Sequence, residues 1–135
     1  MMDESDYAAR LGKMLGVGAP LTWPKQGEDQ MVLMGAAALG LDAARRYTEK
    51  ELNADLAGWL ERFSRPGGLD YVTLRRYLID FRFVDRESDG SAYWVDRDEL
   101  AQEFEPGVFE LETKAVVDAV KAERAARRKQ WRADQ

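Results

Sequence analysis

The chain has 135 residues, of which 45% are hydrophobic, so it is long enough for one domain with a single core and too short for two ordinary domains. It contains no cysteine and no histidine, which excludes disulfides, thiolate nucleophiles, imidazole bases and zinc sites built from Cys and His. The formal charge of -5 excludes the overall basic character that is typical of nucleic-acid-binding proteins.

The first residues predict a short helical arm. The segment 6–15 places four apolar side chains on one face at helical spacing: Tyr7, Leu11, Met14 and Leu15. Glycine and proline at 16–20 end this helix, and Trp23 precedes a proline, a position that avoids helical backbone angles. We therefore expect residues 1–24 to form an arm and an extended lead-in.

Neither a secretory signal nor a membrane span is expected. The start of the chain is acidic where a secretory signal would be basic, and no apolar run approaches the roughly 20 residues of a membrane helix. We expect a cytoplasmic protein that does not contact a membrane.

Two amphipathic helices follow the lead-in. Apolar residues at helical spacing from Asp29 onward predict a helix with Gly40 as its C-cap. Thr48 and Glu51 match a capping box, in which the threonine accepts a hydrogen bond from the first turn and the glutamate accepts one in return. The helix that starts there carries a narrow apolar stripe: Leu52, Leu56, Trp59, Leu60 and Phe63.

The stretch 69–81 predicts a third core helix with apolar residues on two sides. One side is a core stripe of Leu74, Tyr77, Leu78 and Phe81. Val72 and Ile79 point roughly the other way and flank Arg75 and Arg76. A helix of this kind contacts something on both sides.

A β-hairpin is expected next. The segments 83–86 and 92–95 flank Asp89-Gly90, a pair that favours a two-residue hairpin loop. Such a loop sets the register of the strands: Arg86 opposite Tyr93, and Asp85 opposite Trp94. The tip, 85–91, holds three carboxylates against one guanidinium, a net charge of -2, which is the wrong sign for gripping phosphates.

Two more helices are predicted after the hairpin. The segment 96–104 favours a short helix that is broken at 105–107, and Thr113 is expected to cap a longer helix that runs toward Trp131. Between Lys121 and Arg132 this helix has six basic residues against one acidic residue, a local charge of +5. We expect residues 25–95 to form the main domain and residues 96–135 a helical extension.

Residues from about 21 to 95 resemble the DUF2087 family, small bacterial domains found alone or attached to helix-turn-helix regulators. The resemblance rests on these stretches: Tyr47–Asn53, Leu74–Asp80, Asp85-Arg86 with Gly90 and Tyr93, and the opening Leu21–Lys25. The link 64–68 departs from the family because it is longer. The resemblance implies a transcription-associated, winged-helix-like module. It does not imply any activity that could be assigned to particular residues of this chain.

The predicted fold is therefore α+β and mainly helical. It has a winged-helix-like core of three helices with a C-terminal β-hairpin wing, and extra helices flank this core at both ends.

The first functional expectation is a DNA-binding or transcription-associated regulator. Five residues of the helix 69–81 would enter the major groove of double-stranded DNA: Val72, Thr73, Arg75, Arg76 and Ile79. Three residues of the basic C-terminal helix would contact phosphates: Arg124, Arg127 and Arg128. Those cations equally suit the solvated end of a helix.

The alternative is a protein-interaction or dimerisation module that does not bind DNA. Arg75 could pair with an acid of the preceding helix, such as Glu51, and Arg76 with Asp80 one turn later. Val72 and Ile79 would then form an apolar patch for another protein or for a second copy of the chain.

No catalytic, metal or cofactor site is expected. Without histidine and cysteine, an enzyme would need a carboxylate pair or a lysine in a pocket, and no motif identifies either. Asp85, Glu87 and Asp89 alternate as in some calcium loops, but the bidentate glutamate that such a loop needs later is missing.

Overall fold

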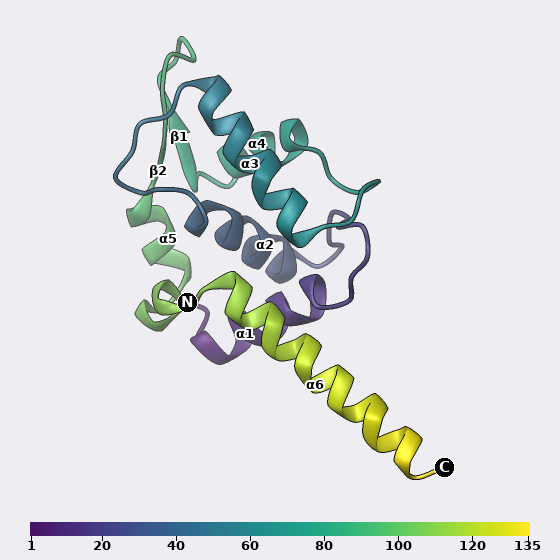
Figure 1. Ribbon diagram of the computed structural model, residues 1–135. Coiled ribbons are helices and arrows are strands. Elements are labelled where there is room, and N and C mark those ends of the chain that lie inside the picture. The colour runs from purple at the N-terminus through teal and green to yellow at the C-terminus, as the bar shows by residue number, and fades with distance from the viewer.

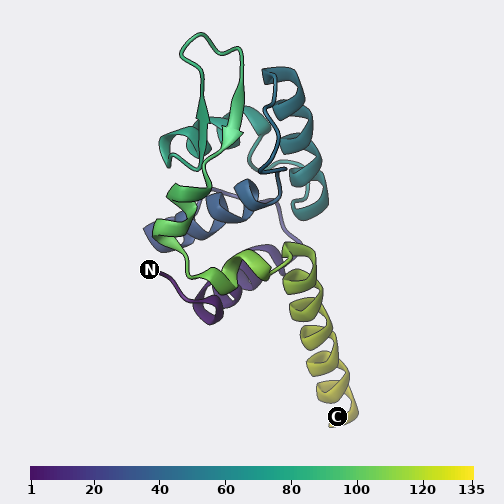
Figure 2. The same cartoon turned by 90° about the vertical axis from the view of Figure 1, so that its left-hand side faces the viewer.

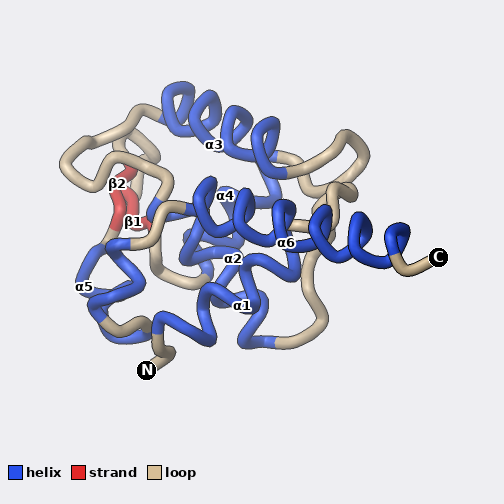
Figure 3. The backbone as a smooth tube through the Cα atoms, turned by 60° about the horizontal axis from the view of Figure 1, so that its bottom comes forward, coloured by secondary structure: helices blue, strands red, loops and turns tan.

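A computed structural model describes residues 1–135 as an α+β, mainly helical fold (Figure 1). Along the chain the elements are α1 (Glu4–Leu15), α2 (Gly27–Leu39), α3 (Glu49–Phe63), α4 (Tyr71–Asp80), β1 (Val84–Arg86), β2 (Tyr93–Val95), α5 (Arg97–Glu103), the 3-10 helix η1 (Pro106–Glu110) and α6 (Thr113–Ala133). The two strands lie at one side of a helical body (Figure 3). None of the helices is both long enough and apolar enough to span a bilayer.

Helix α1 begins at Glu4, two residues earlier than predicted. The carboxylate of Asp3 accepts a hydrogen bond from the amide of Asp6 at 2.8 Å and so caps the first turn. The predicted apolar face is buried through Tyr7, Leu11 and Leu15. The α1 helix is therefore part of the core.

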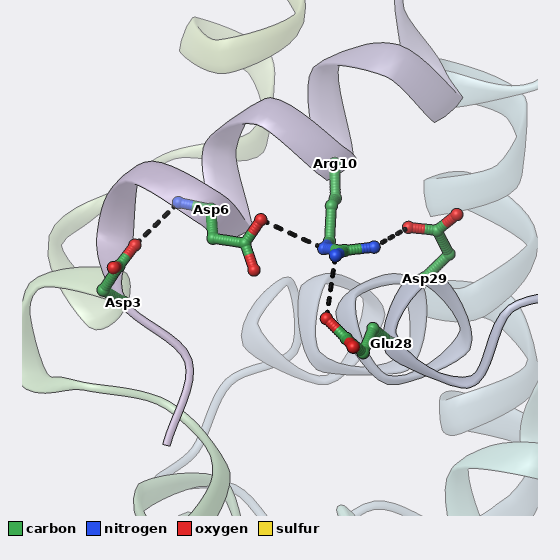
Figure 4. Close-up of polar contacts among 5 residues, drawn as sticks. All are labelled: Asp3, Asp6, Arg10, Glu28 and Asp29. Atoms are coloured by element: carbon green, nitrogen blue, oxygen red, sulfur yellow. Dashed lines mark hydrogen bonds and ion pairs between the residues drawn. The ribbon is translucent and has the colours of Figure 1, made fainter.

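Arg10 ties α1 to the start of α2 (Figure 4). Its guanidinium contacts the carboxylates of Asp6 at 3.1 Å, Glu28 at 2.8 Å and Asp29 at 3.0 Å. The hydrogen bond to Asp29, followed by the one to Asp6, raises the pKa of Arg10. One cation faces three carboxylates, so this edge of the molecule stays acidic.

Helix α2 is the central helix, and it ends at Gly40 as predicted, where the Gly40 amide donates to the carbonyl of Ala36. Seven successive residues are buried, 32–38, because α1 packs on one side of this helix and α4 on another. Gly35 makes room for Phe104: a Cβ at this position would lie 2.6 Å from the phenyl ring. The C-terminal extension thus reaches the centre of the core.

The predicted capping box at the start of α3 is confirmed. The amide of Glu51 donates to Thr48 Oγ1 at 3.2 Å, and the amide of Thr48 donates to Glu51 Oε1 at 2.8 Å. The bond from the Thr48 amide, with help from Arg45, lowers the pKa of Glu51. The apolar stripe is also confirmed, since four of its members are buried: Leu52, Leu56, Trp59 and Leu60.

The hairpin has the predicted register, with these partners: Val84 and Val95, Asp85 and Trp94, Arg86 and Tyr93. Its loop is longer than predicted. The carbonyl of Glu87 accepts from the amide of Gly90, and the amide of Glu87 donates to the carbonyl of Ala92, both at 2.9 Å. The loop therefore spans 88–91, and Gly90 takes the left-handed conformation after the turn, with φ of 75°.

A single residue before α3 extends the pairing of the hairpin. Tyr47 exchanges two backbone hydrogen bonds with Tyr93 of β2, at 2.7 and 2.8 Å. Its ring is buried, and its hydroxyl accepts a hydrogen bond from the amide of Asp42. The start of α3 is therefore fixed to the hairpin.

The C-terminal extension packs with the N-terminal arm. Met2 exchanges backbone hydrogen bonds with the 103–105 segment, and Val117 on the first half of α6 is buried. Thr113 is the first residue of α6 instead of its cap, because Glu112 occupies the cap position and no side chain bonds there. One hydrophobic cluster of 27 residues, from Met2 to Val117, joins both ends of the chain to the middle.

Candidate contact surfaces on α4, the hairpin and α6

Helix α4 starts later than predicted because the residues before it are extended. The amide of Leu69 donates to the carbonyl of Leu21 at 2.7 Å, and a Cβ on Gly68 would lie 2.3 Å from that carbonyl oxygen. Asp70 then caps the helix by accepting from the amide of Thr73 at 2.7 Å, which lowers the pKa of Asp70. The link 64–68 is thus held against the lead-in.

One face of α4 is anchored and the opposite face is open. Leu74 and Leu78 have no exposed surface, whereas Val72 is 48% exposed. The open face of α4 consists of exposed residues, Val72, Arg76 and Asp80, bordered by half-buried ones, Thr73 and Ile79. Four of the five predicted contact residues of this helix therefore share one surface.

Arg75 is the predicted contact residue that turns away from this face. Its guanidinium donates to the amide oxygen of Asn53 and pairs with Glu49 at 3.1 Å, so its side chain is only 20% exposed. The structural alternative, pairing with the preceding helix, is confirmed, but Glu51 was the wrong partner. Glu51 is engaged by Arg45.

Arg76 stays free. The alternative in which Arg76 pairs with Asp80 is wrong, because Arg76 takes part in no ion pair. Its guanidinium lies 5.5 Å from the centre of the Tyr77 ring, which holds the side chain along the helix surface. The open face of α4 therefore offers one free guanidinium.

An aromatic cluster supports the flank of α4. Trp23 stacks on Tyr77 with ring centres 3.8 Å apart and an angle of 6°, and it meets the edge of Phe81 at 6.0 Å. The sequence placed Trp23 in the extended lead-in and in the opening shared with the DUF2087 family, but it predicted no contact for the ring. The sequence did contain a signal for this cluster: an aromatic residue in an extended segment, and two more aromatic residues, Tyr77 and Phe81, one turn apart in the predicted helix 69–81.

The hairpin tip carries more carboxylates than cations. Glu87 pairs with Arg46 at 2.7 Å, and the Arg46 guanidinium lies 4.3 Å from the centre of the Trp94 ring. Counting Arg46 with the tip 85–91 brings its net charge from -2 to -1, which is still not positive. Arg46 was not among the predicted site residues, because its role depends on two partners more than 40 positions away.

The three predicted contact residues of α6 do not lie beside the open face of α4. Arg124 donates to the carbonyl of Gly16 at 3.3 Å, Arg127 pairs with Glu123 at 2.6 Å, and Arg128 is exposed. The second half of α6 leaves the body at the end opposite the hairpin, as Figures 1 and 2 show. The structure therefore does not join the two predicted sets into one surface.

No group of three or more His, Cys, Asp or Glu residues is placed to hold a metal ion. Residues 21–95 match the model of a family described as an uncharacterized protein conserved in bacteria (DUF2087). No curated protein and no solved structure matches the chain.

Proposed function

We propose that this chain, which belongs to the DUF2087 family, is a non-enzymatic, transcription-associated module that acts through a protein contact on a winged-helix-like scaffold. The order of elements supports the scaffold: α2, the pairing residue Tyr47, α3, α4 and then the hairpin. This is the order of a helix-turn-helix core in which a short strand and a two-stranded wing complete the sheet.

The observation that carries the proposal is the composition of the open face of α4. Val72 is 48% exposed and lies one turn before Arg76 and two turns before the half-buried Ile79. Arg76 and Asp80 add one cation and one anion, so this face has no net charge. A mixed, partly apolar surface of this kind suits another protein better than a row of phosphates.

The charge of the hairpin tip also favours a protein partner over DNA. In a winged-helix protein that binds a duplex, the wing would approach the negatively charged backbone beside α4. Here the tip with its partner Arg46 has a net charge of -1, which would repel phosphates.

Duplex binding is a second candidate function, and the second half of α6 favours it. Five cations lie between Arg124 and Arg132, and Arg128, Lys129 and Arg132 make no ion pair. Phosphates could bind there without help from α4. Such binding would be independent of base sequence and steeply dependent on salt.

The experiment that separates these functions combines light scattering of the protein with fluorescence anisotropy of a mixed-sequence DNA duplex. The partner tested here is a second copy of the chain. We expect self-association that persists when salt is raised, since an apolar contact hardly responds to ionic strength. Val72→Asp should abolish it. The matched control is Val17→Asp, because Val17 is equally exposed, at 50%, and lies outside α4.

Duplex binding that survives Val72→Asp and is lost when Arg76 is changed to alanine would overturn the proposal. Duplex binding that is lost only when cations of α6 are removed would support the second candidate.

A further inference from the structure

The second half of α6 carries an exposed ring between free cations. From Arg124 to Arg132 it has five cations and no carboxylate. Trp131 is 64% exposed and is the largest of the exposed apolar side chains. Arg128, Trp131 and Arg132 are three and four positions apart, so they share one side of the helix, and neither arginine forms an ion pair. We call these three residues the basic stripe of α6.

The open face of α4 offers the complementary surface. Val72 is 48% exposed, and Ile79 at the other end of this face also lines a cleft of about 420 Å³. The other walls of the cleft come from the hairpin side of the molecule and the start of α5, and its charged residues are Arg82, Asp85, Asp96 and Glu99. None of these four forms an ion pair, so the cleft has a net charge of -2 beside an apolar helix face.

The basic stripe and the open face cannot meet within one chain. The second half of α6 points away from the body at the end opposite the hairpin, whereas β1 of the hairpin packs against α4 and helps to line the cleft (Figures 1 and 2). The two surfaces are opposite in charge, and each presents an exposed apolar side chain. Phosphates of a duplex would neutralise the arginines of the stripe but would offer little apolar surface to the indole of Trp131. A second copy of the chain fits both properties.

We propose that the chain self-associates head to tail, with the basic stripe of one copy docked on the open face of α4 of the next. The indole of Trp131 packs on Val72 and Ile79, and Arg128 and Arg132 face the carboxylates of the cleft. This inference rests on the proposed function, because it names the partner of the open face and the surface of that partner. A contact between two different surfaces leaves one of each free, so association continues past a dimer unless it closes into a ring.

The first test changes the basic stripe in the full chain. Combining Arg128→Glu with Trp131→Ala should weaken self-association by at least about tenfold, measured by analytical ultracentrifugation. The matched control combines Lys129→Glu with Gln130→Ala. It changes the net charge by the same amount on other sides of the same helix, and it should stay within about threefold of the unchanged chain.

A second test changes the charge of the cleft. Combining Asp85→Asn with Glu99→Gln removes two carboxylates and leaves Asp96, which caps α5, in place. We expect self-association to weaken by about threefold or more. The control combines Asp98→Asn with Glu105→Gln, two exposed residues outside the cleft, and should associate like the unchanged chain. Equal affinity of the two double variants would contradict the docking of the stripe beside the cleft.

A mixing experiment identifies the arrangement directly. Val72→Asp disables the open face and keeps the basic stripe, whereas the variant with Arg128→Glu and Trp131→Ala keeps the open face. Each should be monomeric alone. Mixed in equal amounts, they should form a one-to-one complex that grows no further, because each chain has one working surface.

Several results would overturn the head-to-tail arrangement. They include no self-association of the unchanged chain up to about 1 mM, and no complex in the mixture. If the stripe variant still self-associates and Val72→Asp does not, two α4 helices pack together, so the arrangement is wrong while the proposed function stands. If Val72→Asp still self-associates, the open face is not the contact, and both are wrong.

Discussion

Helix α4 and the second half of α6 both carry two adjacent arginines. The arginines differ in their contacts with the rest of the fold. On α4, Arg75 is drawn into α3 by Glu49 and Asn53, and only Arg76 is left free. On α6, Arg127 and Arg128 lie on a helix that has left the body (Figure 1). The role of two adjacent arginines on an amphipathic helix therefore cannot be predicted until the neighbouring elements are known.

The difference comes from what surrounds each helix. Both α2 and α3 pack against α4, so side chains on its flanks reach carboxylates and amides of other elements. The first half of α6 packs against α1 in the same way, and a Cβ on Gly12 would lie 2.5 Å from Val120. Beyond Arg124 the residues of α6 are exposed and can pair only along their own helix, as Arg127 does with Glu123.

The largest expected effect is on the anchored side of α4. Leu74→Ala removes a side chain with no exposed surface and leaves a cavity between α4 and the core. We expect the free energy of unfolding to fall by about 2–5 kcal/mol, measured by urea denaturation. The control is Val72→Ala on the open face, which should change it by less than about 0.5 kcal/mol. Equal effects would show that α4 has no anchored side.

A smaller effect should separate the two arginines of α4. Arg75→Ala removes a mostly buried guanidinium and leaves Asn53 and Glu49 without their partner, so we expect a loss of about 1–2 kcal/mol of stability. Arg76→Ala removes an exposed side chain with no ion pair and should cost less than about 0.5 kcal/mol. Urea denaturation of both variants measures this. An equally large loss of stability in Arg76→Ala would contradict the conclusion that Arg75 is structural and Arg76 is free.

Local signals in the sequence predicted most of the fold. The capping box of Thr48 and Glu51, the C-cap Gly40 and the strand register all depend on residues close together in the chain, and all are confirmed. The hairpin loop was predicted too short because Asp89-Gly90 suits more than one turn, and the hydrogen bonds of Glu87 select a loop of four residues.

The contact surfaces were harder to predict, because they depend on partners far apart in the chain. Arg75 pairs with Glu49 because Glu49 and Asn53 lie one turn apart on the face of α3 that meets α4, whereas Glu51 points to another side, where it caps the helix and pairs with Arg45. Likewise, the separation of α4 from the basic half of α6 follows from the packing of α6 on α1, and no spacing in the sequence reports it.

The smallest effect on stability is expected on α6, from the double change of Arg127 and Arg128 to alanine. Arg127 and Glu123 form an exposed pair along one helix, and Arg128 makes no ion pair, so little is lost when both are removed. Alanine also favours helix more than arginine does. We expect the free energy of unfolding to change by less than about 0.5 kcal/mol.

The value of this double variant lies in what it does to duplex binding. If phosphates bind the second half of α6, the slope of log K against log salt should fall in size by about 1.8, because two phosphate contacts are lost at about 0.9 each. Arg76→Ala should leave that slope unchanged, since Arg76 lies on α4, apart from this half of α6 (Figure 2). A slope that responds to Arg76 and not to Arg127 and Arg128 would reverse the roles of the two helices.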